Sequence, residues 1–271
     1  MEKVKAIVKG TFLEPFARKI YGCFRAGSSE GRAGQAHMQP TTLEDEVSIA
    51  EDVKRYDLQT VEVMKRILRE DSVCIDVGAH EGDVLQEMVS IAPKGRHHAF
   101  EPIPALAQAL RERFPRVSVH QAALSDEKGE AEFQHVVNSP GYSGLRKRDY
   151  DRLDPVIEKI RVKKVRLDDL LSPQEEVSFI KVDVEGGEYH ALRGGSETLK
   201  RCKPFVVFEA GLKSTSHYGV GPADIYELLV RDCDMNLSTM ERWLGDSPPL
   251  DEQEFIRHFQ EGLDYYFLAY G

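Results

Sequence analysis

Apolar residues recur along the chain with two alternating spacings. Short apolar runs, typical of strands buried on both faces, are separated by segments with apolar positions three and four residues apart, typical of helices. The runs lie at 73–77, 98–101, 117–122, 177–184, 205–208, 236–240 and 265–270. Helical spacing covers 57–69, 84–91, 104–114, 188–199, 223–230 and 252–260. This alternation predicts an α/β fold with a doubly wound, Rossmann-like, seven-stranded, mostly parallel sheet covered by helices on both faces.

Residues 126–176 interrupt the alternation and form a predicted insertion. Within it, 131–136 alternates like a strand and 162–167 is its expected partner. Because the insertion leaves the third strand at the carboxyl edge of the sheet, we expect it to cover the substrate side of a cleft there. Tyr142 and Ser143 lie in a stretch of amides, hydroxyls and an aromatic ring, so they are candidate substrate contacts.

The first 42 residues differ from the rest of the chain. The first 32 hold seven Lys and Arg against three Glu, and Phe12, Phe16, Ile20 and Phe24 recur every four residues. We therefore predict a basic helical extension and linker over 1–42, followed by one domain over 43–271. The extension either packs on this domain or a second subunit, or lies on an anionic membrane surface.

Charge and composition exclude several classes of protein. With 36 Lys and Arg against 46 Asp and Glu, the net charge is -10, which disfavours binding to nucleic acid. No apolar run is long enough for a transmembrane segment. The four cysteines are widely separated and form no metal or redox motif, so we expect them to be reduced and the protein to be cytoplasmic.

The strongest chemical signal is the loop Asp76-Val77-Gly78-Ala79-His80-Glu81-Gly82 between the first strand and its helix. Gly78 permits a tight turn and close approach of a ligand, and Gly82 lets the helix begin close to the strand. Glu101 ends the second strand 23 residues after Gly78, where a carboxylate can accept both ribose hydroxyls of an adenosine ligand. Two ligands fit: a dinucleotide or S-adenosylmethionine. His80 stands at the middle-glycine position of the dinucleotide fingerprint, and Asp76 suits a cationic ligand, so S-adenosylmethionine is favoured.

The segment Ala123-Leu124-Ser125-Asp126 follows the third strand. This point of the sheet edge lies beside the end of the second strand, so the Asp126 carboxylate could reach an adenine amino group. It could equally be a turn or helix-capping residue. The candidate cofactor residues are therefore Asp76, Gly78, Ala79, His80, Gly82, Glu101, Ser125 and Asp126.

These segments, together with Ile180-Lys181-Val182-Asp183-Val184-Glu185-Gly186-Gly187-Glu188, resemble the FkbM family of S-adenosylmethionine-dependent methyltransferases. The resemblance covers about 56–209. It implies a class I methyltransferase fold and O-methylation of hydroxyls on sugars and specialised metabolites. By position, Asp76, Gly78, Glu101 and Asp126 resemble the cofactor site, and Asp183 and Glu185 are implied to lie beside the transferred methyl. His80 and Gly187 depart from the residues more common in the family.

Acidic residues also end the fourth and fifth strands. Asp183 and Glu209 should lie on neighbouring strands, about 5 Å apart. They could hold a divalent cation such as Mg²⁺ that polarises a substrate hydroxyl, or bind the hydroxyls of a polyol directly. His217, in a polar loop after the fifth strand, is either the general base or a solvated loop residue. The basic run 146–148 either binds an acidic acceptor or is a solvated run of charge.

The sequence therefore favours an O-methyltransferase that acts on a small-molecule acceptor, with Asp183, Glu185 and His217 as candidate catalytic residues. Three alternatives stay open. An N-methyltransferase would act on an amine, which needs less assistance from a base. A nicotinamide-dependent oxidoreductase would bind NAD in the same loop. A non-catalytic module would keep only the cofactor-binding fold.

Overall fold

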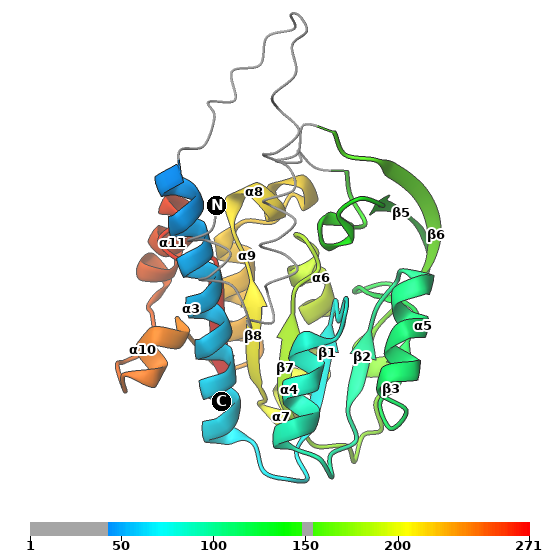
Figure 1. The fold of residues 1–271 in the computed structure, drawn as a ribbon. Helices are drawn as coiled ribbons and strands as arrows, with labels where there is room; N and C mark the ends of the chain where they lie inside the picture. Colours follow the sequence, from blue (N-terminus) through cyan, green and yellow to red (C-terminus); the bar gives the residue numbers. More distant parts are fainter. Residues whose placement is uncertain (1–42, 148–153) are drawn as a thin grey trace, which may run out of the picture.

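The computed structural model describes residues 43–147 and 154–271 (Figure 1). The extension predicted over 1–42 lies outside the described residues. None of the helices within the described ranges combines the length and the apolar character needed to cross a membrane. The cysteines of this part of the chain, Cys74, Cys202 and Cys233, form no disulfide.

A seven-stranded sheet forms the centre of the molecule, with strand order β3-β2-β1-β7-β8-β10-β9. Its first five strands in this order are parallel, whereas β10 is antiparallel to both β8 and β9. The predicted seven-stranded, mostly parallel sheet is therefore confirmed. The strands are β1 (Val73–Val77), β2 (His98–Phe100), β3 (Ser118–His120), β7 (Val177–Val182), β8 (Phe205–Glu209), β9 (Asn236–Ser238) and β10 (Tyr266–Tyr270).

Helices cover both faces of the sheet, which explains why the central strands are mostly apolar. Cys74 and Phe179 face one layer, whereas Ile75 and Ile180 face the other. The first layer contains α3 (Leu43–Ile67), α4 (Asp83–Ile91), α5 (Pro104–Arg113) and α10 (Met240–Leu244). The second contains α6 (Glu188–Arg193), α7 (Ser196–Cys202), α9 (Pro222–Tyr226), the π-helical turn η4 (Glu227–Asp232) and α11 (Glu252–Glu261).

The two strands of the insertion, β5 and β6, form a second, three-stranded sheet together with β4, which precedes the insertion, in the order β4-β6-β5. Residues 131–136 form the predicted strand, but their partner is 157–162 and not the predicted 162–167: Ala131 lies opposite Val162, and Val136 lies opposite Ile157, in an antiparallel ladder. Figure 1 shows this hairpin rising over one end of the large sheet. Its elements are β4 (Ala123–Leu124), β5 (Gly129–Val136), β6 (Ile157–Val165) and the 3₁₀ turns η1 (Pro140–Tyr142) and η2 (Leu167–Asp169).

The single helix predicted over 188–199 is instead two helices, α6 and α7, which meet at Gly194 and Gly195. A Cβ atom on Gly194 would lie 2.0 Å from the carbonyl oxygen of Ser125, and one on Gly195 would lie 2.9 Å from Leu167 Cδ2. The two ends of the insertion thus pack against the break, a tertiary contact that helical periodicity does not reveal. Helix α8 (Leu212–Thr215) and turn η3 (Ser216–Tyr218) follow β8.

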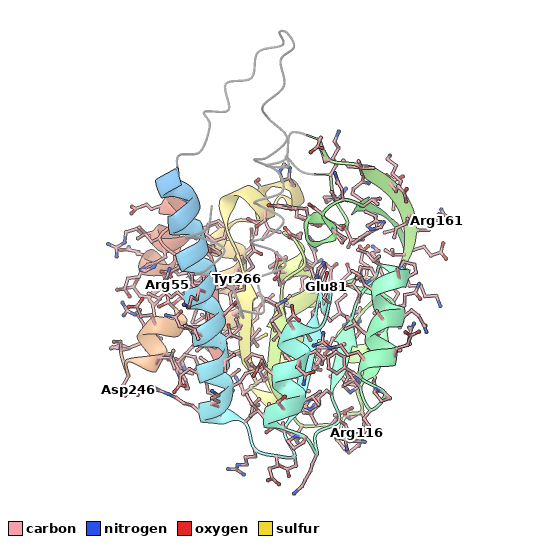
Figure 2. The ribbon with its side chains drawn as sticks, in the orientation of Figure 1. Arg55, Glu81, Arg116, Arg161, Asp246 and Tyr266 are labelled. Atoms are coloured by element: carbon pink, nitrogen blue, oxygen red, sulfur yellow. The ribbon has the colours of Figure 1, made fainter. Side chains whose placement is uncertain are left out.

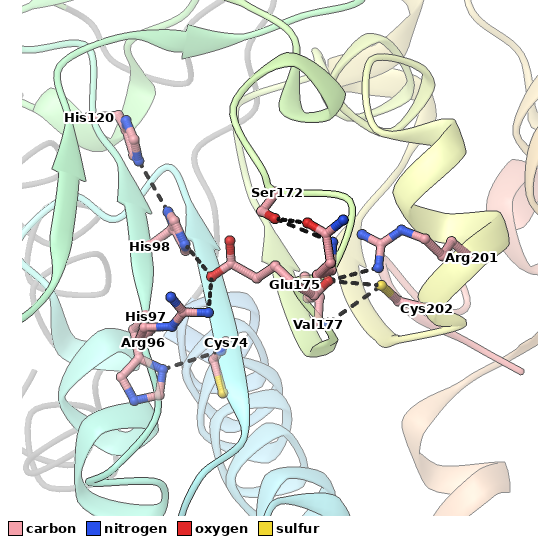
Figure 3. A network of polar contacts seen from close by, with 11 residues as sticks. Cys74, Arg96, His97, His98, His120, Ser172, Glu175, Val177, Arg201 and Cys202 are labelled. Atoms are coloured by element: carbon pink, nitrogen blue, oxygen red, sulfur yellow. Dashed lines mark hydrogen bonds and ion pairs between the residues drawn. The ribbon is translucent and has the colours of Figure 1, made fainter.

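A chain of polar contacts joins the strands near the amino end of the sheet (Figure 3). His98 Nδ1 lies 3.2 Å from His120 Nε2, and its Nε2 lies 3.2 Å from Glu175 Oε1. The neighbouring His97 accepts a hydrogen bond from the Cys74 amide at Nδ1. These contacts tie β1, β2 and β3 to the loop before β7.

Candidate functional site

A deep cleft opens at the carboxyl ends of the parallel strands, between the large sheet and the inserted hairpin. It contains about 1270 Å³ of empty space, counted out to its open mouth. Clefts at this edge are the usual ligand sites of doubly wound sheets. Its walls come from the ends of β1, β2, β7 and β8, the start of β10, and the segment around η1.

The loop after β1 approaches the end of β7 at Gly78. Gly78 has a φ of 79°, and a Cβ atom there would lie 1.9 Å from the carbonyl oxygen of Asp183. The amides of Gly78 and Ala79 both donate to the Phe100 carbonyl, at 2.9 and 3.1 Å. A glycine is therefore required for the ends of β1 and β7 to meet, and the loop forms the floor of the cleft.

Glu101 follows β2 directly and lines the cleft, although only 4% of its surface is exposed. Its two carboxylate oxygens accept hydrogen bonds from the amides of His80 and Ile103, each at 2.9 Å. Burial raises the pKa of Glu101 to about 7 despite these hydrogen bonds. His80 is held in the left-handed region, with a φ of 48°, so this amide points at the carboxylate.

Asp76, in β1, is buried below the Gly78 turn and also lines the cleft. Its carboxylate oxygens make no hydrogen bond within normal distance and angle limits, and Lys181 Nζ lies 3.9 Å from Oδ1. Burial raises its pKa to about 6, although Lys181 acts in the opposite direction. A buried carboxylate with unused acceptor capacity suits a cationic group in the cleft.

A buried network organises the end of β7. Asp183 Oδ2 accepts a hydrogen bond from the Tyr266 hydroxyl at 2.9 Å and lies 3.1 Å from Lys181 Nζ. Burial favours the neutral form of Asp183, but the Lys181 charge and the Tyr266 hydrogen bond outweigh it and hold the pKa of Asp183 below its usual value. Burial disfavours the charged form of Lys181, but the charges of Asp183 and Asp76 outweigh this effect and raise the pKa of Lys181. The pair is therefore ionised at neutral pH.

This network does not fit the predicted divalent cation site. The Lys181 ammonium and the Tyr266 hydroxyl already occupy Oδ2 of Asp183, and a second cation would be repelled by Lys181. No group of three or more His, Cys, Asp or Glu side chains within the described ranges is arranged to hold a metal ion. The prediction that Asp183 and Glu209 bind Mg²⁺ is therefore not supported. Lys181, which is not among the predicted site residues, supplies the positive charge beside Asp183.

Most predicted cofactor residues line the cleft, but three do not. Gly82 packs against α5: with a φ of 84°, its Cβ position lies 2.6 Å from Leu110 and Phe114 atoms. Ser125 and Asp126 are also absent from the lining. Asp126 forms a hydrogen bond with His190 Nδ1 and an ion pair with Arg193 instead, and so ties the insertion to α6. The lining near β2 is completed by Phe100, Ala122, Ala123 and Leu124.

The predicted substrate residues are divided in the same way. Ser143 and Glu209 line the cleft, whereas Tyr142 is buried and does not. Ser143 Oγ accepts a hydrogen bond from the Val136 amide at 3.0 Å, which holds the η1 segment against β5. Glu185 lines the cleft from a turn in which it adopts a φ of 61°.

His217 does not line the cleft, but its neighbour Tyr218 does. Sequence reasoning also missed Lys181, Tyr265 and Tyr266, all part of the lining. Lys181 could have been found, because a lysine inside an apolar strand must be buried with anionic partners. The tyrosines carry no comparable signal, since aromatic residues are common in buried strands.

Three comparisons relate the chain to known proteins. Residues 76–237 match the family described as the methyltransferase FkbM domain. The 2-O-methyltransferase NoeI of Sinorhizobium fredii is 29% identical over 161 residues, which are 52% of this chain and 65% of that protein. The match thus spans a little less than two thirds of the relative's length.

Solved structures show weaker similarity. A methyltransferase FkbM from Methylobacillus flagellatus is 13% identical, with 95% of this chain and 60% of that one covered and a TM-score of 0.46. The plantazolicin methyltransferase BpumL in complex with SAH is 9% identical, with 99% and 96% covered and a TM-score of 0.41. The family match includes more than half of the chain and contains the ends of β1, β2, β7 and β8 that line the cleft. The chain therefore belongs to the methyltransferase FkbM domain family.

Proposed function

We propose that this protein transfers a methyl group from S-adenosylmethionine to a hydroxyl oxygen of a sugar or another specialised metabolite. The observation that supports this most is the charge of the cleft. Among the described residues that line it, seven are acidic and one, Lys181, is a lysine or arginine. S-adenosylmethionine carries a sulfonium and an ammonium group, whereas these carboxylates would repel the diphosphate of NAD, and the Lys181 ammonium is already paired with Asp183 and Asp76.

We assign the cofactor to the half of the cleft formed by β1 and β2. Glu101 would accept the ribose hydroxyls, and Asp76 would face a cationic part of the ligand. The apolar wall of Phe100 and Ala122–Leu124 offers a surface for the adenine ring. When bound, S-adenosylmethionine supplies a methyl group that is already activated by the sulfonium. The protein must then hold the acceptor oxygen in line and receive its proton.

We assign the acceptor to the half formed by β7, β8 and β10. Asp183 is ionised and fixed by Lys181 and Tyr266, so its remaining acceptor capacity can bind the hydroxyl that is methylated. Glu185 and Glu209 are the other carboxylates within this part of the lining. We propose Asp183 and Glu185 as catalytic residues, with Ser143 and Glu209 as substrate contacts. His217, outside the lining, has no role in this proposal.

Calorimetric titration with S-adenosylmethionine and with NAD tests the cofactor assignment. We expect S-adenosylmethionine to bind and NAD not to bind. Glu101→Ala should weaken its binding by about 1–3 kcal/mol, because buried amides and ribose hydroxyls lose a partner. Glu130→Ala, at an exposed site on the hairpin, is the matched control and should bind normally. Binding of NAD, or unchanged affinity in Glu101→Ala, would contradict the assignment.

One observation supports the alternative of an N-methyltransferase: the carboxylates of the cleft could also bind a protonated amine. Mass spectrometry of a product labelled from S-adenosylmethionine separates the two functions. A methyl ether supports the proposal, whereas an N-methyl group overturns the choice of acceptor atom.

A further inference from the structure

Lys181 stands between the two halves of the cleft. In the parallel pairing of β1 with β7, Lys181 lies directly opposite Asp76, and Asp183 follows two residues later on the same side of the chain. The Lys181 ammonium lies 3.1 Å from Asp183 Oδ2 and 3.9 Å from Asp76 Oδ1. Figure 2 shows Glu81 and Tyr266, which line the cofactor half and the acceptor half, at the same end of the sheet. One ammonium group therefore serves a carboxylate in each half.

The two carboxylates are held differently. Asp183 Oδ2 accepts a hydrogen bond from the Tyr266 hydroxyl at 2.9 Å, in addition to its contact with Lys181. Asp76 is 1% exposed, and at 3.9 Å the ammonium is too far away for a hydrogen bond. Neither Asp76 oxygen has a hydrogen-bond partner of normal geometry in the described part of the chain. Asp76 thus keeps its capacity for a further cationic group, whereas Asp183 is already oriented.

Asp76 depends on Lys181 for its charge. Three acids of the described chain, Asp83, Asp183 and Glu101, lie close enough to oppose its ionisation. Burial acts in the same direction, and it raises the pKa of Asp76 to about 6 even with Lys181 in place. Without the ammonium, a carboxyl group in this position would hold its proton at neutral pH and would attract a cation only weakly.

We propose that Lys181 is a positioning residue that neutralises Asp76 in the ligand-free protein and gives up this carboxylate to a cationic group of S-adenosylmethionine. Lys181 then pairs with Asp183 alone. This inference rests on the proposed function and links its two halves, because binding of the cofactor completes the fixing of the carboxylate that faces the acceptor.

Electrostatics favours this exchange. A ligand cation beside Asp76 supplies the charge that Lys181 provided, and two cations near one carboxylate repel each other. The Lys181 ammonium is carried by a flexible four-carbon stem and already lies closer to Asp183 than to Asp76. A short movement is therefore sufficient, and the buried charge of Lys181 keeps a partner throughout.

The first test counts protons. Calorimetric titration with S-adenosylmethionine at pH 7.5, repeated in buffers with different enthalpies of ionisation, gives the number of protons released on binding. In the wild-type protein Asp76 is already ionised at this pH and should release almost none. Lys181→Met should raise the pKa of Asp76 above the assay pH, so that the ligand must expel this proton. We expect about one more proton to be released by the variant than by the wild-type protein.

Two further variants assign this proton. Asp183 and Glu101 also lie near Lys181, so a change in their ionisation must be separated from that of Asp76. The Lys181→Met/Asp76→Asn double variant keeps both residues and should release no additional proton. Lys159→Met makes the same change in net charge at an exposed site and should behave like the wild-type protein. An additional proton that persists in the double variant, or its absence from Lys181→Met, would overturn the inference.

Crystal structures of the wild-type protein with and without S-adenosylmethionine give a second test, which does not depend on the folding of any variant. We expect the distance from Lys181 Nζ to Asp76 to increase well beyond the ion-pair limit of about 4 Å when the ligand is bound, while the contact with Asp183 is kept. An unchanged position of Lys181 would also overturn the inference. If the wild-type protein does not bind S-adenosylmethionine in the calorimeter, the proposed function itself fails. If it binds without these changes, only the role of Lys181 is wrong.

Discussion

The buried carboxyl groups of the cleft differ in their pKa values, although burial raises the pKa of each. Asp76 and Glu101 are both almost fully buried, and burial raises their pKa values to about 6 and about 7. Asp183 experiences the same desolvation, yet its pKa is lowered because Lys181 lies 3.1 Å away. The neighbouring charge, and not the residue type, thus decides which carboxyl group is a permanent anion.

The affinity for S-adenosylmethionine should depend on pH through Glu101. The ionised form accepts hydrogen bonds from ribose hydroxyls most strongly, so a proton competes with the ligand below a pKa of about 7. We expect affinity to fall by up to about tenfold between pH 8 and pH 6. Calorimetry across this range measures the change, and Glu101→Gln should bind weakly with a flatter profile. An affinity independent of pH in the wild-type protein would contradict the assignment.

At the scale of elements, the site depends on how closely the ends of β1 and β7 approach each other. Gly78 contacts the Asp183 carbonyl, and the turn that follows β7 is held by Glu188. Glu188 Oε1 accepts hydrogen bonds from the amides of Val184 and Gly186, at 2.9 and 3.1 Å. This contact fixes the turn in which Glu185 and Gly186 adopt left-handed conformations. The two loops therefore position the two halves of the cleft together.

Gly78→Ala should separate these loops. The new Cβ atom would clash with the Asp183 carbonyl oxygen and would require a strained φ of 79°. We expect a loss of about 2–4 kcal/mol in the free energy of unfolding, measured in urea, and weaker binding of S-adenosylmethionine. Gly211→Ala is the matched control, because no atom lies within 4 Å of its Cβ position. Equal stability of the two variants would show that the loops tolerate separation.

At the scale of the whole molecule, buried groups make stability depend on pH in two opposing ways. Burial raises the pKa of Asp76 to about 6 and of Glu101 and Glu188 to about 7, so they stabilise the fold when protonated and lose this contribution as pH rises. Burial lowers the pKa of His97 and His120. The stabilisation of the fold by their neutral imidazoles is therefore complete above about pH 6.5 and is lost as the pH falls. Above pH 6.5 the carboxyl groups therefore dominate.

The melting temperature of the ligand-free protein should accordingly decrease between pH 6.5 and pH 8. Glu101 and Glu188 should each lose about 1 kcal/mol of stabilisation in this interval, which corresponds to a decrease of a few degrees. Calorimetric scans at constant ionic strength measure the change. The Glu101→Gln/Glu188→Gln double variant should show a smaller pH dependence. A melting temperature that increases over this range in the wild-type protein would refute the argument.

The sequence predicted the sheet well because its strands are buried on both faces and therefore read as apolar runs. It also placed Gly78 and Glu101 at the cleft, since both follow a strand at the carboxyl edge. The sequence did not predict the features that depend on contacts between distant segments. The break at Gly194 depends on Ser125, and the separation of Asp126 from the cleft depends on His190 and Arg193.

The sequence by itself determined the order of strands and helices, the acidic loop after β1 and the family, because these depend on local periodicity and on motifs contiguous in the chain. Only the tertiary structure decided what charge each of these acids carries. Lys181, Asp183 and Tyr266 become a single network when β7 and β10 are brought together around β8. The pKa values of buried groups depend on neighbours within a few ångströms, and 83 residues of sequence separate Asp183 from Tyr266.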